Sequence, residues 1–208
     1  TVQQAIVQKL ARVITGLKSA QLLLNHGYFQ EQSAIHRMLD EFEQDIAFLS
    51  LAILNNEVTD LHKRYLEAFY EEEFDSPDNP ISSIQKRAMV PRKKIHAYLA
   101  NSQAEVSDPS RGIELSRTLS KAYSGYIHGA SPHIMHLYGG NPSYFHVSGM
   151  LGTPHESGYR SDLWNYFYRA LLSFELVANV FKEYQLASDL RTFSQSVANN
   201  AGKDYSAD

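Results

Sequence analysis

The chain has 208 residues, of which 43% are hydrophobic, and its formal net charge is -4. A chain of this length and apolar content can bury a core of its own, so we expect a single folded domain over residues 1–208 and not a disordered chain. With 19 basic against 23 acidic side chains, a globally basic surface that coats nucleic acid is excluded, although a local basic site is not. The absence of cysteine excludes disulfides, thiolate metal sites and thiol catalysis.

Neither a membrane span nor an export signal stands out in the sequence. The longest nearly unbroken apolar run, residues 46–54, is far shorter than the roughly 20 residues that a membrane-spanning helix needs. No segment at the start of the chain has the pattern of a secretory signal. We therefore expect a cytoplasmic protein with no membrane partner.

Apolar residues at steps of three and four predict long helices in the first third of the chain. The first helix covers residues 2–24 and ends at Gly27, a usual helix terminator. The second covers residues 29–55. Thr59 is a favourable N-cap for a third helix, which ends in the acidic run 71–73.

The middle of the chain predicts shorter helices. The Asn-Pro pair at 79–80 indicates the start of a short helix, which Pro91 kinks or restarts, so that residues 92–99 are again helical. An Asp-Pro pair opens a fifth helix over residues 108–128. Gly129 then ends it in the left-handed conformation that helix ends prefer.

The last part of the chain contains a long insertion and two more helices. Residues 129–158 hold many of the glycines, prolines and histidines, yet they are too apolar for a solvated tether and predict a structured loop with one short helix inside it. A long aromatic helix follows at 159–184, Ser188 caps a last helix, and residues 201–208 are expected to fray. The predicted fold is all-α, a bundle of six or seven helices without strands.

The end of the fifth helix carries the residues most suited to chemistry. Lys121, Ser124 and His128 are spaced by three and then four positions, so a cation, a hydroxyl and an imidazole share one helix face. The negative end of the helix dipole favours the protonated ring of His128, as a general acid requires. The structural alternative is that His128 satisfies a last-turn carbonyl, while Ser124 bonds back to the main chain.

Two short stretches of sequence carry a family resemblance. They are Tyr123-Ser124-x-x-x-His128-Gly129 and the run 33–41, Ser-Ala-Ile-His-Arg-Met-Leu-Asp-Glu. Together they resemble a large family of bacterial all-helical proteins of unknown function that looks related to the HEPN superfamily. The helical bundles of that superfamily include metal-independent endoribonucleases and abortive-infection or toxin proteins.

The resemblance, which spans roughly residues 5–185, implies a homodimer that cleaves RNA, or descends from proteins that did, in phage defence or toxin–antitoxin systems. It implies no cofactor. HEPN nucleases place an arginine five to seven positions before the histidine, whereas here Lys121 stands seven and Arg117 eleven positions before His128. On this reading His128 is the acid, Lys121 or Arg117 contacts the phosphate, and Ser124 is a positioning hydroxyl.

Three further residues are candidates for substrate binding. Tyr123 lies beside the row on the fifth helix, and His36 and Arg37 reach the same place if the second and fifth helices pack together. The alternative for His36 and Arg37 is a solvated or ion-paired face with Asp40 and Glu41, of which Glu41 has the favourable four-residue spacing from Arg37.

Other residue clusters are interpreted as structural. The histidines of the insertion lack the His-Glu-x-x-His and Glu-x-x-His patterns, so we predict no metal site. The basic cluster at 86–94 is interpreted as a solvated face, with an RNA or protein patch as the alternative. A second function is consistent with all these residues, namely a non-catalytic module that binds a small ligand, or a protein partner along the aromatic helix at 159–184.

Overall fold

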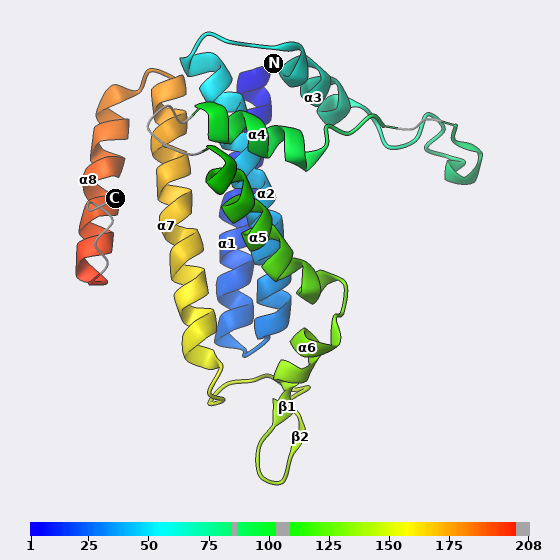
Figure 1. Ribbon diagram of the computed structural model, residues 1–208, viewed down its shortest axis with the longest axis vertical. Coiled ribbons are helices and arrows are strands. Elements are labelled where there is room, and N and C mark those ends of the chain that lie inside the picture. Colours follow the sequence, from blue (N-terminus) through cyan, green and yellow to red (C-terminus); the bar gives the residue numbers. More distant parts are fainter. Residues whose placement is uncertain (85–86, 103–108, 203–208) are drawn as a thin grey trace.

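The computed structural model describes residues 1–84, 87–102 and 109–202 (Figure 1). Within these ranges the chain forms eight α-helices and a single pair of two-residue strands, which confirms the predicted all-α class. None of the helices in the described ranges combines the length and the apolar content that a membrane span requires. Lys86, Asp108 and the tail 203–208 lie outside the described residues.

Two long antiparallel helices, α1 (Val2–Asn25) and α2 (Phe29–Leu54), form the centre of the molecule (Figure 1). Gly27 ends the first helix with a φ of 78°, where a side chain would collide with the backbone of Met150. Its carbonyl accepts a hydrogen bond of 2.9 Å from the Met150 N–H. Gly27 therefore reverses the chain after α1 and also binds the insertion 129–158 through Met150.

The third helix also begins where the sequence predicts. α3 (Asp60–Tyr70) has Thr59 as its N-cap, and the Thr59 backbone N–H donates to Nδ1 of His62 at 3.1 Å. The short helix predicted after Asn79 is wrong, because only a single 3-10 turn, η1 (Pro80–Ser82), forms there. Ile81 is 99% exposed, so this turn has no packed apolar face that would let a helix propagate.

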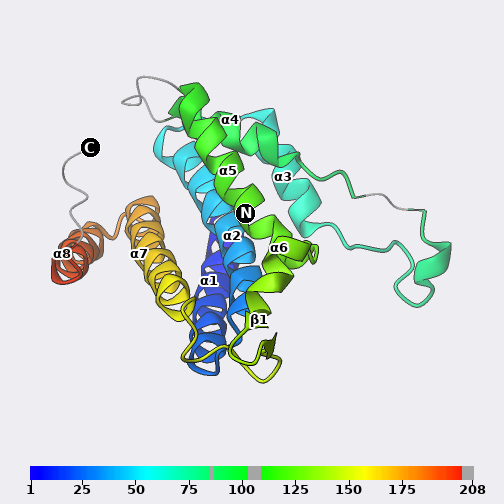
Figure 2. The same ribbon diagram turned by 60° about the horizontal axis from the view of Figure 1, so that its bottom comes forward.

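Helices α4 (Arg92–Ser102) and α5 (Pro109–Ile127) pack against α2 (Figures 1 and 2). α5 ends one residue before the predicted end, and Gly129 follows with the predicted left-handed φ of 62°. The fifth helix, with its candidate residues, is therefore seated directly on the central hairpin.

The insertion between α5 and α7 is structured, as predicted. It contains α6 (Ser131–Ile134), the 3-10 turn η2 (Met135–Leu137) and the strands β1 (Tyr138–Gly139) and β2 (Tyr144–Phe145), which pair antiparallel. The prediction that no strand forms is wrong at this hairpin. Two-residue strands are too short for alternating hydrophobicity to reveal them.

The aromatic segment divides into α7 (Glu156–Val180) and α8 (Tyr184–Asn200), which differs from the predicted helices at 159–184 and from Ser188 onward. The chain reverses between them at Lys182, whose φ is 62°. Left-handed backbone is uncommon for a residue other than glycine, so the sequence carries no ordinary signal for this break. α8 packs on the outer side of α7, at the edge of the bundle (Figure 2).

Candidate functional site

The candidate row lies on one face of α5. Arg117, Lys121, Ser124 and His128 are separated by four, three and four positions, a spacing that keeps them on one side of a helix. Arg117, Lys121 and His128 are exposed, and Ser124 is half-buried. His128 follows the last residue of the helix and donates its backbone N–H to the Ser124 carbonyl at 3.1 Å. The row presents two cations and an imidazole to solvent, and the hollows described below are lined by other residues.

The inner side of α5 anchors this row to the bundle. The hydroxyl of Ser120 donates to the Asp40 carboxylate of α2 at 3.1 Å. The ring of Tyr123 makes edge contacts with His36 and with Tyr166 of α7, at centroid distances of 5.9 and 5.8 Å. Burial raises the pKa of the Tyr123 hydroxyl well above its usual value. Tyr123, a predicted substrate contact, is thus packed into the junction of three helices.

His36 lies in neither of the surroundings that we considered for it. Its side chain has no exposed surface, and its ring stacks on Tyr166 at a centroid distance of 4.3 Å. Burial, with a contribution from Arg169, lowers the pKa of His36 to about 3, so the ring is neutral at ordinary pH. The buried His36 ring packs against Tyr123 and has no surface with which to contact a substrate.

Arg37 forms an ion pair within its own helix. Its Nη2 lies 2.6 Å from Oε1 of Glu41, which confirms the ion-paired alternative at the four-residue spacing. The other terminal nitrogen, Nη1, is buried without a hydrogen-bond partner. Arg37 therefore keeps one donor that is not used by the fold.

A buried charge network between α2 and α7 was missed in the sequence. Asp40 is buried, and its carboxylate accepts hydrogen bonds from Arg169 at 2.8 Å, Gln44 at 2.9 Å and Ser120 at 3.1 Å. It does not lie on a solvated face. The signal was present, since Gln32, His36, Asp40 and Glu43 recur at steps of three and four along α2, where they form a polar stripe beside the apolar one.

Glu43 is the least satisfied member of this network. Its Oε2 lies 2.8 Å from Nη2 of Arg169, but neither carboxylate oxygen receives a hydrogen bond of acceptable geometry. Burial raises the pKa of Glu43 to about 8; the Arg169 charge opposes this rise, and the Asp40 charge adds to it. Glu43 is therefore mostly protonated at neutral pH, and Asp40 is the main counter-ion of Arg169.

Three histidines of the insertion, His133, His136 and His155, gather with tyrosines beside the end of α5. The Tyr159 hydroxyl lies 3.1 Å from the Tyr126 hydroxyl and 3.1 Å from Nδ1 of His136, whose ring stacks on His155 at 4.8 Å. They line a shallow hollow of about 190 Å³. Burial lowers the pKa of His136, and the neighbouring imidazoles act in the same direction. Over the described ranges, no three His, Cys, Asp or Glu side chains are arranged to hold a metal ion.

The basic cluster of the sequence is divided between separate surroundings. Arg92 binds Asp45 and Gln44 of α2, and Arg87 pairs with Glu73 at 3.2 Å. Lys93 and Lys94 of the same cluster are exposed. Arg92, the first residue of α4, thus attaches this helix to α2, and Arg87 attaches the segment before it to Glu73.

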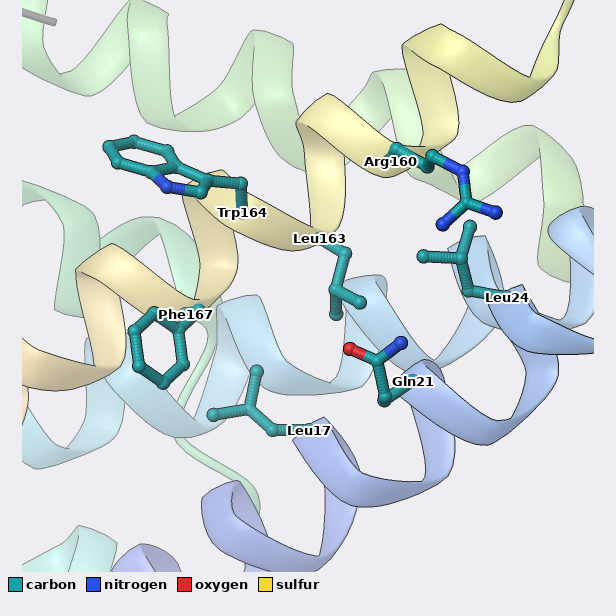
Figure 3. A pocket seen from close by; sticks show the side chains of 7 residues that line it. All are labelled: Leu17, Gln21, Leu24, Arg160, Leu163, Trp164 and Phe167. Atoms are coloured by element: carbon teal, nitrogen blue, oxygen red, sulfur yellow. The ribbon is translucent and has the colours of Figure 1, made fainter. Parts of the chain in front are cut away.

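The aromatic side chains of α7 point in two directions. Tyr159 and Tyr166 are buried, which confirms the predicted core role of this helix. Trp164 and Phe167 instead border a hollow of about 360 Å³ between α1 and α7, whose floor is formed by Leu17 and other leucines (Figure 3). The Trp164 ring is stacked on Tyr168 at 5.4 Å.

Comparison with protein-family models, with curated proteins and with solved structures finds no match to this chain.

Proposed function

We propose that the protein cleaves RNA without a metal ion, or descends from proteins that did, and that the row on α5 is the reacting surface. The observation that carries this proposal is the shared, solvent-facing side of Arg117, Lys121, Ser124 and His128. Cations near a reacting phosphate stabilise the charge that develops on it, and an imidazole transfers protons near neutral pH. The row offers both kinds of group on a rigid helix.

In the proposed reaction the ribose 2′-oxygen attacks the adjacent phosphorus, and the bond from phosphorus to the 5′-oxygen breaks. The proton of the 2′-hydroxyl passes to solvent, and His128 gives a proton to the departing 5′-oxygen. The products are a 2′,3′-cyclic phosphate and a 5′-hydroxyl end. Lys121 contacts the reacting phosphate, Arg117 contacts a neighbouring phosphate one helical turn away, and Ser124 positions the ribose.

The packing behind α5 supports this assignment. Ser120 and Tyr123 attach the helix to α2 and α7, so the exposed row is held on a rigid support, as a catalytic surface requires. Arg37 adds no donor to this surface, because its unpartnered Nη1 is buried. The homodimer implied by the family resemblance belongs to the same proposal, and sedimentation equilibrium of the purified chain tests it.

The deciding experiment is cleavage of a structured RNA in excess EDTA, with the end groups of the products identified. We expect the parent to produce cyclic phosphate ends and His128→Ala to lose at least about a hundredfold in rate. His26→Ala is the matched control, because His26 is also exposed and follows the last residue of a helix, α1. It should cleave like the parent.

Cleavage that is absent in the parent, or equal in the parent and His128→Ala, would contradict a catalytic role for the row. The non-catalytic module would then be the better description. RNA binding measured separately by fluorescence anisotropy distinguishes a binding protein from one that ignores RNA. Lys121→Ala should weaken binding in a salt-dependent manner if the row contacts phosphates.

A further inference from the structure

A third hollow is lined by residues of α2, α4 and α7 and by none of the row. Figure 1 shows that α4 crosses α2. Its volume of about 460 Å³ falls in the range of roughly 300–1,000 Å³ that is typical of small-molecule sites. Its walls are largely apolar and include Leu51, Leu99, Leu172 and Leu176. Leu172 is exposed although it belongs to the bundle, so apolar surface of this hollow is left in contact with water.

The polar end of this hollow is built around Arg169. One third of the Arg169 side chain (34%) is exposed, whereas Glu43 is 5% exposed and both of its carboxylate oxygens are sealed from solvent. A molecule that enters the hollow therefore meets the guanidinium and not the carboxyl. The ring of Tyr166 lies 4.8 Å below the guanidinium carbon and fixes its plane.

The charges around Arg169 also favour an anion with a single charge. Asp40 accepts a hydrogen bond from Nη2 of Arg169 at 2.8 Å, and Glu43 also lies 2.8 Å from Nη2, so both carboxyl groups of the fold meet the guanidinium at one nitrogen. Glu43 is mostly protonated at neutral pH and so adds little negative charge. A dianionic phosphate would be repelled more strongly by Asp40 than a carboxylate, which also matches the planar geometry of a guanidinium.

We propose that the hollow between α2, α4 and α7 binds a small amphipathic carboxylate, with its head group on Arg169 and its apolar body along Leu51, Leu99, Leu172 and Leu176. This site is separate from the α5 row and does not depend on RNA cleavage. A chain carboxylate fits because, among the described residues, Arg169 is the one guanidinium or ammonium that lines a largely apolar hollow, whose other polar lining residues are Glu43, Gln44, His96 and Ser173.

Isothermal titration with three probes of equal chain length tests the head-group chemistry. We expect decanoate to bind at least about tenfold more tightly than decan-1-ol, because a charge-assisted hydrogen bond contributes that much. Decylammonium should bind no better than decan-1-ol. Equal binding of decanoate and decan-1-ol, or tightest binding of decylammonium, overturns the proposal.

Filling the hollow tests its location. Ala47, a half-buried residue of α2, lines the hollow, so Ala47→Phe should weaken decanoate binding at least about tenfold. Ala11→Phe places the same ring on the exposed face of α1 and should bind decanoate like the parent. Leu172→Ser, at an exposed wall position, keeps the test valid if Ala47→Phe does not fold, and it should weaken binding of decanoate and decan-1-ol alike. Unchanged affinity in the folded wall variant refutes the site.

The effect of pH tests the part played by Glu43. Decanoate binding should weaken as pH rises through 8, because an ionised Glu43 then repels the carboxylate, and Glu43→Gln should abolish this dependence. In the described part of the chain, the charged or titratable groups that act on Glu43 or line the hollow with it are Asp40 on α2, Arg169 and Tyr166 on α7, and His96 on α4. Burial lowers the pKa of His96 and raises that of Tyr166 away from this window. A parent whose affinity does not change across pH 8 contradicts the proposal.

Discussion

Replacing Arg169 should be the most damaging single change to the buried network. Arg169 is the only cation within 4 Å of both Asp40 and Glu43 among the described residues, at 2.8 Å from each. In Arg169→Met the Asp40 carboxylate, which is 2% exposed in the parent, keeps only the hydrogen bonds from Gln44 and Ser120. A buried charge left without its partner is strongly destabilising.

The expected loss can be bounded from the geometry. Removing one partner of a buried ion pair costs about 3–5 kcal/mol, and the lower end applies here because the Arg169 side chain is 34% exposed. We therefore expect the free energy of unfolding to fall by about 3 kcal/mol. Part of this loss should be recovered by adding Asp40→Asn, which removes the uncompensated charge.

Urea denaturation at neutral pH, followed by circular dichroism, measures these values for the parent, both single variants and the double variant. The coupling free energy from this cycle should be about 1 kcal/mol or more, with an unchanged dependence on urea concentration. A loss below 1 kcal/mol for Arg169→Met, or additive effects in the cycle, would show that the network does not work as an ion pair.

Three further predictions concern Glu43, His36 and Gly27. Burial raises the pKa of Glu43 to about 8, above its unfolded value, so the free energy of unfolding falls as pH rises toward 8. Urea denaturation should show that Glu43→Gln stabilises the protein at pH 8 and changes its stability little at pH 4. Burial lowers the pKa of His36 to about 3, so stability is lost as pH falls below 6.5, and His36→Phe should shift acid unfolding to lower pH. Gly27→Ala should lower the free energy of unfolding by roughly 1–3 kcal/mol, because φ is 78° and a Cβ would lie 2.7 Å from the Met150 nitrogen. Equal pH profiles for parent and variant, or an unchanged midpoint for Gly27→Ala, would contradict these expectations.

The elements that could be predicted from the sequence are those whose signals are local. The residue preferences of Thr59 and Gly129 predict a helix start and a helix end. In the structure Thr59 is the N-cap of α3, and Gly129 has the left-handed conformation after α5. The break at Lys182 has no such signal, because its φ of 62° lies in the left-handed region, which lysine rarely adopts. Helix boundaries that depend on tertiary contacts cannot be predicted from local sequence patterns.

The same distinction applies to the candidate site. Helical spacing predicts that Lys121, Ser124 and His128 share a face, since this follows from the period of the helix alone. The burial of His36 and Asp40 does not follow from it, because a polar stripe is interpreted as solvated unless its partner is known. That partner, Arg169, lies far away in the sequence on α7 and is brought to α2 only by the fold.

Asp40 connects the buried network to α5, the helix that carries the row. Asp40 holds Arg169 of α7 with one oxygen and Ser120 of α5 with the other. Ser120 lies one position from Lys121, so the hydrogen bond that fixes α5 on α2 also fixes the rotation of the helix that presents Lys121 and His128. Loss of the Asp40 carboxylate removes this bond together with the ion pair to Arg169. Any activity of the row should therefore depend on a carboxylate that never meets the substrate.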